Sequence, residues 1–242
     1  MQKILVNLIV ALLLFTPKLF AEEGSTYQFG WLDKDKEVYV LQNREYKKVN
    51  TINLNVSFGM SLSEAFVDET MIQGRLGYYF WESWGLELLY SSNSGKTNSN
   101  YAGITGGYGK GTSSGPGSTP YVNIIDSYTA FIINWAPFYS KINLFNGIVY
   151  LDWSFGLGGV SVSEKNNAQL VAAGGTGESY QSETSMGLLF QTSWIFYLSR
   201  SFDIRLDLIG LSYSALAPTG NYTTAKQTTS QWDAVLGVGF RF

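Results

Sequence analysis

Three charged residues stand at alternate positions near the end of the chain: Asp203, Arg205 and Asp207. In an extended strand this spacing puts their side chains on one face. Paired carboxylates can do acid–base chemistry, but an arginine between two acids is more simply explained as an ion-paired cluster. The chain contains no histidine and no cysteine, so a His-based dyad or triad cannot be built. We therefore expect no enzyme activity, no cofactor and no metal site.

Other charges share the polar faces of segments that alternate in the same way. An eight-stranded barrel is just wide enough for its own side chains to fill, and unpaired charges in so tight a space are costly. We expect interleaved acids and arginines to neutralise one another as a salt-bridged plug. Because six acids face three bases, a selective ion or proton path is the alternative. The residues assigned to the interior are Arg75, Glu87, Asp126, Asp152, Asp203, Arg205, Asp207, Asp233 and Arg241.

The elements that must position these charges are strands. From Thr51 onward, apolar residues alternate with Asn, Ser, Gly and a few charges, which is the period of a half-buried strand. The composition agrees, since aromatic residues make up 16% and charged residues only 14% of the chain. The eight candidate strands lie within 51–60, 72–80, 86–91, 121–135, 149–158, 186–198, 202–208 and 232–242.

The connections between these strands alternate between short and long. Those around residues 81–84, 137–146 and 199–201 are short, whereas those around 95–120 and 163–182 are long and polar, as in membrane barrels. Aromatic residues gather at the short-turn ends, where a girdle at the membrane interface is expected. They are Tyr78, Phe80, Trp81, Trp84, Trp135, Tyr139, Trp194, Phe196, Tyr197, Phe202, Phe240 and Phe242.

The predicted fold is all-β: an eight-stranded antiparallel up-and-down transmembrane β-barrel over residues 50–242. The competing fold is a soluble barrel or sandwich, whose outer face should be rich in Lys and Glu. Here the polar faces carry Asn, Ser and Gly, and Lys occurs only in loops, turns and the leader. A crowded polar interior explains this pattern better than a surface facing water.

The first 49 residues predict export. Residues 1–21 combine Lys3 with an apolar run and end in Ala21, as a cleavable signal peptide does, and a retained anchor is the alternative. Residues 22–49 form a charged segment, expected to be a solvated periplasmic leader or to fold back into the barrel mouth. Without its leader the chain is mildly acidic and has no basic cluster, so no nucleic acid is expected as partner.

The leader, the amphipathic strands and the final segment QWDAVLGVGFRF resemble small Gram-negative outer-membrane β-barrel proteins. Residues 35–49 further resemble an uncharacterised subset with a charged N-terminal segment. The resemblance implies a monomer in the lipid of the cell outer membrane, and it implies that Phe240 and Phe242 belong to the signal for the barrel-insertion machinery.

The long connection around residues 95–120 offers a candidate binding surface. Tyr101 and Tyr108 stand there among Gly, Ser, Thr and Asn, a composition typical both of adaptable binding surfaces and of flexible solvated loops. An extracellular ligand is therefore possible. The expected function is structural or surface interaction without catalysis, and the alternative is a narrow pore.

Overall fold

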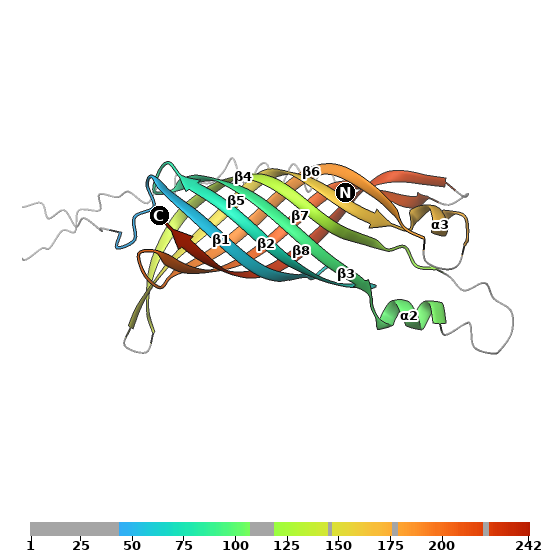
Figure 1. Cartoon of the computed structure of the whole chain (residues 1–242), viewed down its shortest axis with the longest axis horizontal. Helices are drawn as coiled ribbons and strands as arrows, with labels where there is room; N and C mark the ends of the chain where they lie inside the picture. Colours follow the sequence, from blue (N-terminus) through green and yellow to red (C-terminus); the bar gives the residue numbers. More distant parts are fainter. Residues whose placement is uncertain (1–43, 107–118, 145–146, 176–178, 220–222) are drawn as a thin grey trace, which may run out of the picture. The chain divides into compact units, whose positions relative to one another are not determined.

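The barrel begins directly after the charged N-terminal segment. The computed structural model describes residues 44–106, 119–144, 147–175, 179–219 and 223–242. The chain divides at residue 46, and the unit Tyr46–Phe242 is a closed barrel of eight strands (Figure 1). Each strand pairs antiparallel with the next, and β1 closes on β8. The predicted fold class is confirmed, while residues 1–43 lie outside the described part of the chain.

The first three strands are shorter than the remaining five. The first three are β1 (Thr51–Ser61), β2 (Val67–Tyr79) and β3 (Trp84–Thr97). The remaining five are β4 (Asn123–Leu144), β5 (Gly147–Asn166), β6 (Gln181–Tyr197), β7 (Phe202–Thr219) and β8 (Thr223–Arg241).

The two ends of the barrel differ. One end, which we call the turn end, carries the β2–β3 and β6–β7 turns and the last residue of β8, and the β4–β5 hairpin projects from it (Figure 1). The opposite end, the loop end, carries α2 (Ser99–Gly106) and α3 (Ala168–Ala172). Neither of these helices, in the described residues, is long and apolar enough to span a membrane.

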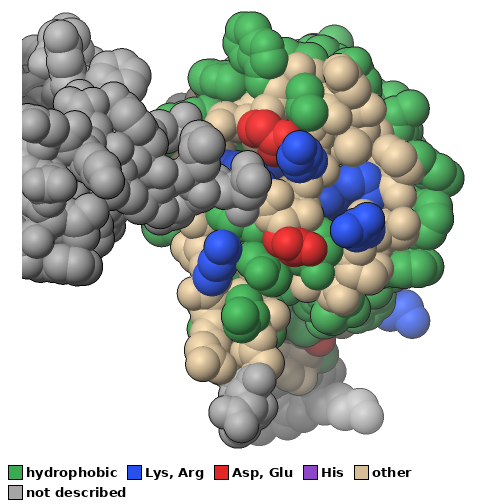
Figure 2. Space-filling view, turned by 90° about the vertical axis from the view of Figure 1, so that its left-hand side faces the viewer, with side chains coloured by type: hydrophobic (Ala, Val, Ile, Leu, Met, Phe, Trp, Pro, Cys, Tyr) green, Lys and Arg blue, Asp and Glu red, His purple; other side chains and the backbone are tan. Residues whose placement is uncertain are grey.

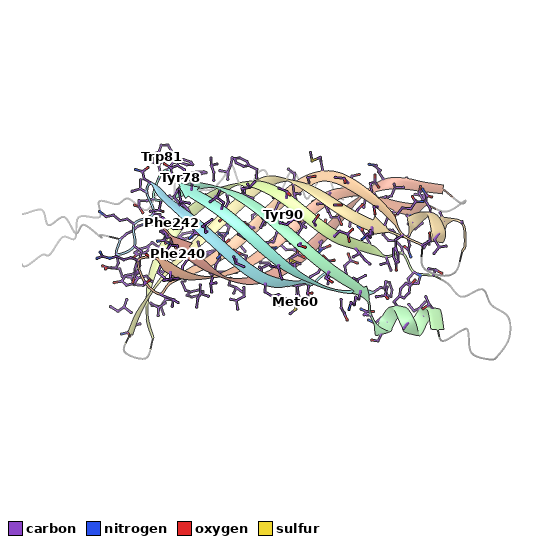
Figure 3. The ribbon with its side chains drawn as sticks, in the orientation of Figure 1. Met60, Tyr78, Trp81, Tyr90, Phe240 and Phe242 are labelled. Carbon is purple, nitrogen blue, oxygen red and sulfur yellow. The ribbon has the colours of Figure 1, made fainter. Side chains whose placement is uncertain are left out.

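Alternation along each strand separates an apolar outer face from a mixed inner face. On β1, Val56 and Phe58 are 62% and 57% exposed, whereas Asn55 and Ser57 beside them are buried inside the barrel. Apolar side chains project outward around the whole barrel, and Tyr78, Trp81, Phe240 and Phe242 gather at the turn end (Figure 3). The strand period thus turns the apolar residues away from the interior, opposite to a soluble barrel.

Three details of the strands differ from the sequence-based expectations. The segment 137–146, predicted as a short turn, continues β4 as far as Leu144. Asp126, predicted inside, lies outside and pairs with Lys165 (2.8 Å), because a register shift between Ile125 and Ser127 reverses the alternation there. Tyr197, predicted in the outer girdle, is buried inside the barrel.

Candidate functional site

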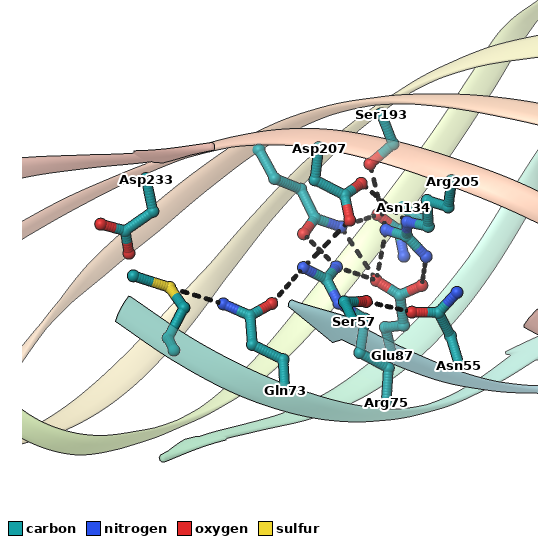
Figure 4. A network of polar contacts seen from close by, with 12 residues as sticks. Asn55, Ser57, Gln73, Arg75, Glu87, Asn134, Ser193, Arg205, Asp207 and Asp233 are labelled. Carbon is teal, nitrogen blue, oxygen red and sulfur yellow. Dashed lines mark hydrogen bonds and ion pairs between the residues drawn. The ribbon is translucent and has the colours of Figure 1, made fainter. Parts of the chain in front are cut away.

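The interior near the turn end holds an ion network that crosses the barrel. Glu87 on β3 accepts two hydrogen bonds from Arg205 on β7, one of them at 3.0 Å (Figure 4). Arg205 also bonds Asp207, two residues along the same strand, through its Nε at 2.7 Å. Strands β3 and β7 are not neighbours in the barrel, so this ion pair spans the lumen.

A second arginine completes the charge balance of this network. Arg75 on β2 lies 3.2 Å from Asp207 and 3.6 Å from Glu87. It also donates to the side-chain oxygens of Gln191 on β6 (2.9 Å) and Gln73 (2.8 Å). Two arginines therefore face two carboxylates, all of them buried, and amides fill the remaining contacts. The charges of this network balance one another, while two of its buried atoms, Arg75 Nε and Asp207 Oδ2, form no hydrogen bond within the described residues.

A separate polar layer closes the turn end of the barrel. Lys48, which precedes β1, is fully buried and forms an ion pair with Asp152 on β5. Tyr197 donates a hydrogen bond of 2.7 Å to Asp152, and the Lys48 ammonium lies 4.9 Å from the centre of the Tyr79 ring. Seen from this end, charged side chains occupy the centre and hydrophobic ones surround them (Figure 2). The residues just before β1 thus enter the mouth of the barrel.

A further ion pair at the turn end ties the last strand to its neighbour. Arg241 on β8 lies 3.2 Å from Asp203 on β7, and its guanidinium sits 4.6 Å from the centre of the Tyr197 ring. Asn53 donates a hydrogen bond of 3.0 Å to the same carboxylate of Asp203. Strands β1, β7 and β8 therefore share one contact, next to the place where the sheet closes.

Glycines on the inner face make room for these polar side chains. A Cβ on Gly156 would lie 2.6 Å from Asn134 Oδ1 and from Gln191 Cγ, distances that real atoms do not tolerate. By contrast, a Cβ on the outward-facing Gly159 of the same strand would meet nothing within 4 Å. Asn134 and Gln191 of the polar interior are thus packed directly against the backbone at Gly156.

An apolar layer lies beyond the ion network, toward the loop end. Leu89 follows Glu87 by two residues on β3, and Ile209 follows Asp207 by two on β7, so each points inward next to the network. This layer was missed by the sequence analysis, although pairs such as Leu88–Leu89 and Leu188–Leu189 show that both faces of a strand are apolar there. It comprises Met71, Leu89, Ile125, Tyr128, Ala130, Ile132, Val160, Val162, Leu189, Ile209, Leu211, Tyr213, Ala215 and Val235.

The loop end is acidic. Glu64, in the β1–β2 connection, is partly buried, and this burial raises the pKa of its carboxyl group. Burial and the nearby acids Glu164, Glu64 and Glu183 raise the pKa of Tyr121, whose hydroxyl donates to the Leu216 carbonyl oxygen. Among the described residues, no group of three or more acidic, His or Cys side chains is arranged to hold a metal ion.

Of the two tyrosines predicted to bind a ligand, the structure describes only Tyr101. Tyr101 is only 6% exposed and packs with Val67 and Val122, so α2 is held against the loop end of the barrel. Its ring is therefore a packing group rather than part of a solvated loop. Tyr108 lies outside the described residues, and a binding role for this connection stays a prediction.

The predicted interior charges are placed together by the fold. All seven residues of the predicted lumen cluster lie inside the barrel, in the two groups described above: Arg75, Glu87, Arg205 and Asp207 in one, Asp152, Asp203 and Arg241 in the other. Lys48 was missed because it precedes the first strand and has no alternating pattern around it. Phe240 and Phe242 form an edge-to-face pair (4.8 Å) at the turn end.

Comparisons with known proteins find similar structures but no similar sequences. No family model and no curated protein matches the chain. The N-terminal β-barrel domain of Pseudomonas aeruginosa OprF is 14% identical, covers 80% of this chain and 98% of its own, and gives a TM-score of 0.42. The outer membrane protein OprG of the same species is 14% identical (83% and 99% covered, TM-score 0.42). Ail, the attachment invasion locus protein of Yersinia pestis, is 12% identical. The match covers 80% of this chain and 99% of the Ail chain, with a TM-score of 0.35.

Proposed function

We propose that this chain is an integral outer-membrane barrel with a sealed lumen, serving envelope structure or surface interaction rather than permeation or catalysis. The observation that carries the proposal is the filling of the lumen by two charge-balanced layers and an apolar layer. A channel needs a continuous wet path. Here the Glu87–Arg205 pair crosses the lumen, and leucine and isoleucine side chains occupy the next level.

The outer face supports a membrane location. Soluble monomers rarely expose apolar patches larger than a few hundred Å². In this barrel Ile72, Leu188 and Val238, which come from three different strands, are each more than 60% exposed, and such side chains surround the barrel. Because β1 closes on β8, none of the eight described strands is an edge strand, as a strand protein in lipid requires. Lipid contact, a monomeric state and export by residues 1–21 belong to the same proposal.

The absence of histidine and cysteine supports a non-catalytic role. The two carboxylates first considered for acid–base chemistry, Asp203 and Asp207, are held in ion pairs with Arg241 and Arg205. A binding role at the loop end, for an unidentified extracellular ligand, would use the α2 region and the extended β7–β8 hairpin. Insertion by the barrel-assembly machinery through Phe240 and Phe242 is likewise part of the proposal.

The test is purification of the full chain from membranes, followed by two measurements. Electrophoresis with and without boiling should show two mobilities, because a closed barrel resists the detergent until it is heated. Planar bilayer recordings should show no steady current. Steady, ion-selective single-channel currents from the wild-type protein would refute the sealed lumen and establish the narrow-pore alternative.

A further inference from the structure

The β4–β5 hairpin reaches beyond the rim of the barrel. Strand β4 pairs with β3 only as far as Trp135, and β5 pairs with β6 only from Tyr150 onward. Within the described residues, 138–144 of β4 therefore pair with β5 alone, and 147–149 of β5 pair with β4 alone. The outer edges of the hairpin thus lack the neighbouring strands that the barrel supplies elsewhere.

The hairpin projects sideways instead of continuing along the barrel axis. A register shift between Trp135 and Phe138 puts an extra residue into β4 at the base of the hairpin, and such a bulge bends a strand. Along the barrel axis, the hairpin lies at the level of Phe240 and Phe242 (Figure 3). Seen from the turn end, it extends past the round outline of the barrel (Figure 2). In a membrane, a hairpin placed in this way runs along the interface that the aromatic residues mark.

One face of the hairpin continues the apolar outer face of the barrel. The rings of Phe138 and Trp153 pack together with their centroids 5.5 Å apart, and Trp153 stacks in turn on Trp194 of β6 (6.1 Å). Ile142 and its cross-strand partner Val149 extend this face toward the tip. Phe138 and Ile142 are 51% and 40% exposed, so the face is not covered by the rest of the barrel.

The opposite face of the hairpin is more polar. The Lys141 ammonium lies 5.6 Å from the centre of the Tyr150 ring, and the rings of Tyr139 and Tyr150 are stacked (6.0 Å). Asn143 follows on the same face, and its cross-strand partner Ile148 is an apolar exception near the tip. Lysine and tyrosine combine an apolar body with a polar end, which suits the boundary between lipid and water. The hairpin is therefore amphipathic.

We propose that the β4–β5 hairpin is an interfacial anchor, whose apolar face lies on the lipid leaflet at the turn end. This inference rests on the proposed membrane location of the barrel. The apolar face needs an apolar surface, and it is continuous with the barrel face that is proposed to contact acyl chains. The unpaired backbone edges exclude deep burial in hydrocarbon, whereas headgroups and water at the interface can form hydrogen bonds with them. A lipid surface therefore satisfies both the side chains and the backbone of the hairpin.

The experiment uses the full chain, folded in vesicles of phosphatidylcholine. Because the chain contains no cysteine, one introduced cysteine can carry an environment-sensitive fluorophore at a chosen position. Ile142→Cys reports on the apolar face, and Asn143→Cys, on the opposite face of the same strand, is the matched control. Val238→Cys, on the outer face of β8, reports whether the barrel itself is in the lipid. Each label is quenched either by lipids that carry a nitroxide at a shallow or a deep acyl position, or by iodide on both sides of the membrane.

Shallow nitroxides should quench the label at position 142 about twofold more strongly than the label at position 143, because interfacial amphipathic segments lie about 5–10 Å into the boundary between headgroups and acyl chains. Iodide should quench the two labels in the reverse order. Should Ile142→Cys fail to give a heat-modifiable barrel, Val149→Cys on the same face replaces it.

The proposal is overturned if iodide quenches the labels at 142 and 143 alike while nitroxide lipids quench the label at 238, a result that leaves the membrane location intact. It is also overturned if the label at 142 is shielded from iodide but not quenched by lipid, because a second copy or another protein would then cover the face. If nitroxide lipids do not quench the label at 238 either, the membrane location itself is refuted, and the anchor with it.

Discussion

Replacing Arg205 with leucine is the most direct test of the ion network. Arg205 is 3% exposed and holds Glu87 by two hydrogen bonds and Asp207 by one. In Arg205→Leu the network keeps one cation, Arg75, against two carboxylates. Breaking a buried ion pair by removing one partner costs about 3–5 kcal/mol. Because Arg75 already contacts both acids, we expect a loss of about 3 kcal/mol, at the lower end of that range.

The double variant separates charge balance from simple loss of contacts. Adding Glu87→Gln to Arg205→Leu leaves one arginine, Arg75, with one acid, Asp207, which lie 3.2 Å apart. We expect this change to recover part of the lost stability, although it removes a further charged group. Glu87→Gln alone leaves two arginines with one acid and should destabilise as well. A double-mutant cycle should therefore give a coupling energy well above 1 kcal/mol.

The free energy of unfolding can be measured by urea titration of the barrel in lipid vesicles, followed by tryptophan fluorescence and by gel mobility. Lys165→Leu is the matched control, because its partner Asp126 lies on the outside and both side chains are more than one-third exposed. Such exposed pairs contribute about 0–1 kcal/mol. If Arg205→Leu costs no more than Lys165→Leu, the lumen is hydrated and the sealed-barrel reasoning is wrong.

Three further changes test other parts of the barrel. Gly156→Ala should destabilise by about 1–3 kcal/mol, because its Cβ would overlap network side chains at 2.6 Å, whereas Gly159→Ala on the same strand should change stability little. Lys48→Met should cost about 3 kcal/mol in urea unfolding by leaving the Asp152 charge in the mouth, and adding Asp152→Asn should recover part of this loss. Phe242→Asp should lower the amount of folded, heat-modifiable protein in membranes, and wild-type amounts would contradict its role as an insertion signal.

The strands were predictable from the sequence wherever one face is apolar and the other polar. Residues 51–60 alternate without exception, and the structure places β1 there with Val56 and Phe58 outward. Alternation fails as a guide where a strand contains an extra residue. Asp126 has the parity of an inward residue when counted from Tyr128, but the register shift beside Ile125 places it outside. A bulge depends on how two strands pair, which the sequence of one strand does not reveal.

At the turn end, the place of a residue in the strand alternation predicted whether it faces inward better than its residue type did. Tyr197 was placed in the outer girdle because it is aromatic, yet it shares its face with Ser193, and the structure buries it with its hydroxyl on Asp152. The contact of Lys48 with Asp152 could not be predicted, because the two are 104 residues apart and Lys48 belongs to no strand. The pairing of Glu87 with Arg205 likewise depends on the closed barrel, which brings β3 and β7 to face each other across the lumen.

Layers of two physically different kinds, charged and apolar, fill the lumen, and this leads to a last prediction about conduction. The ion network of Arg75, Glu87, Arg205 and Asp207 blocks the path by filling it, and the loss of this network would leave space that water could enter. The adjoining apolar layer would still exclude water, since narrow apolar constrictions are dewetted. Arg205→Leu should therefore be less stable than wild type and yet carry no steady current in planar bilayers. Adding Leu189→Ser, in the apolar layer, should permit at least intermittent currents. Steady conduction by Arg205→Leu alone would show that neither the apolar layer nor the polar layer at the turn end blocks ions.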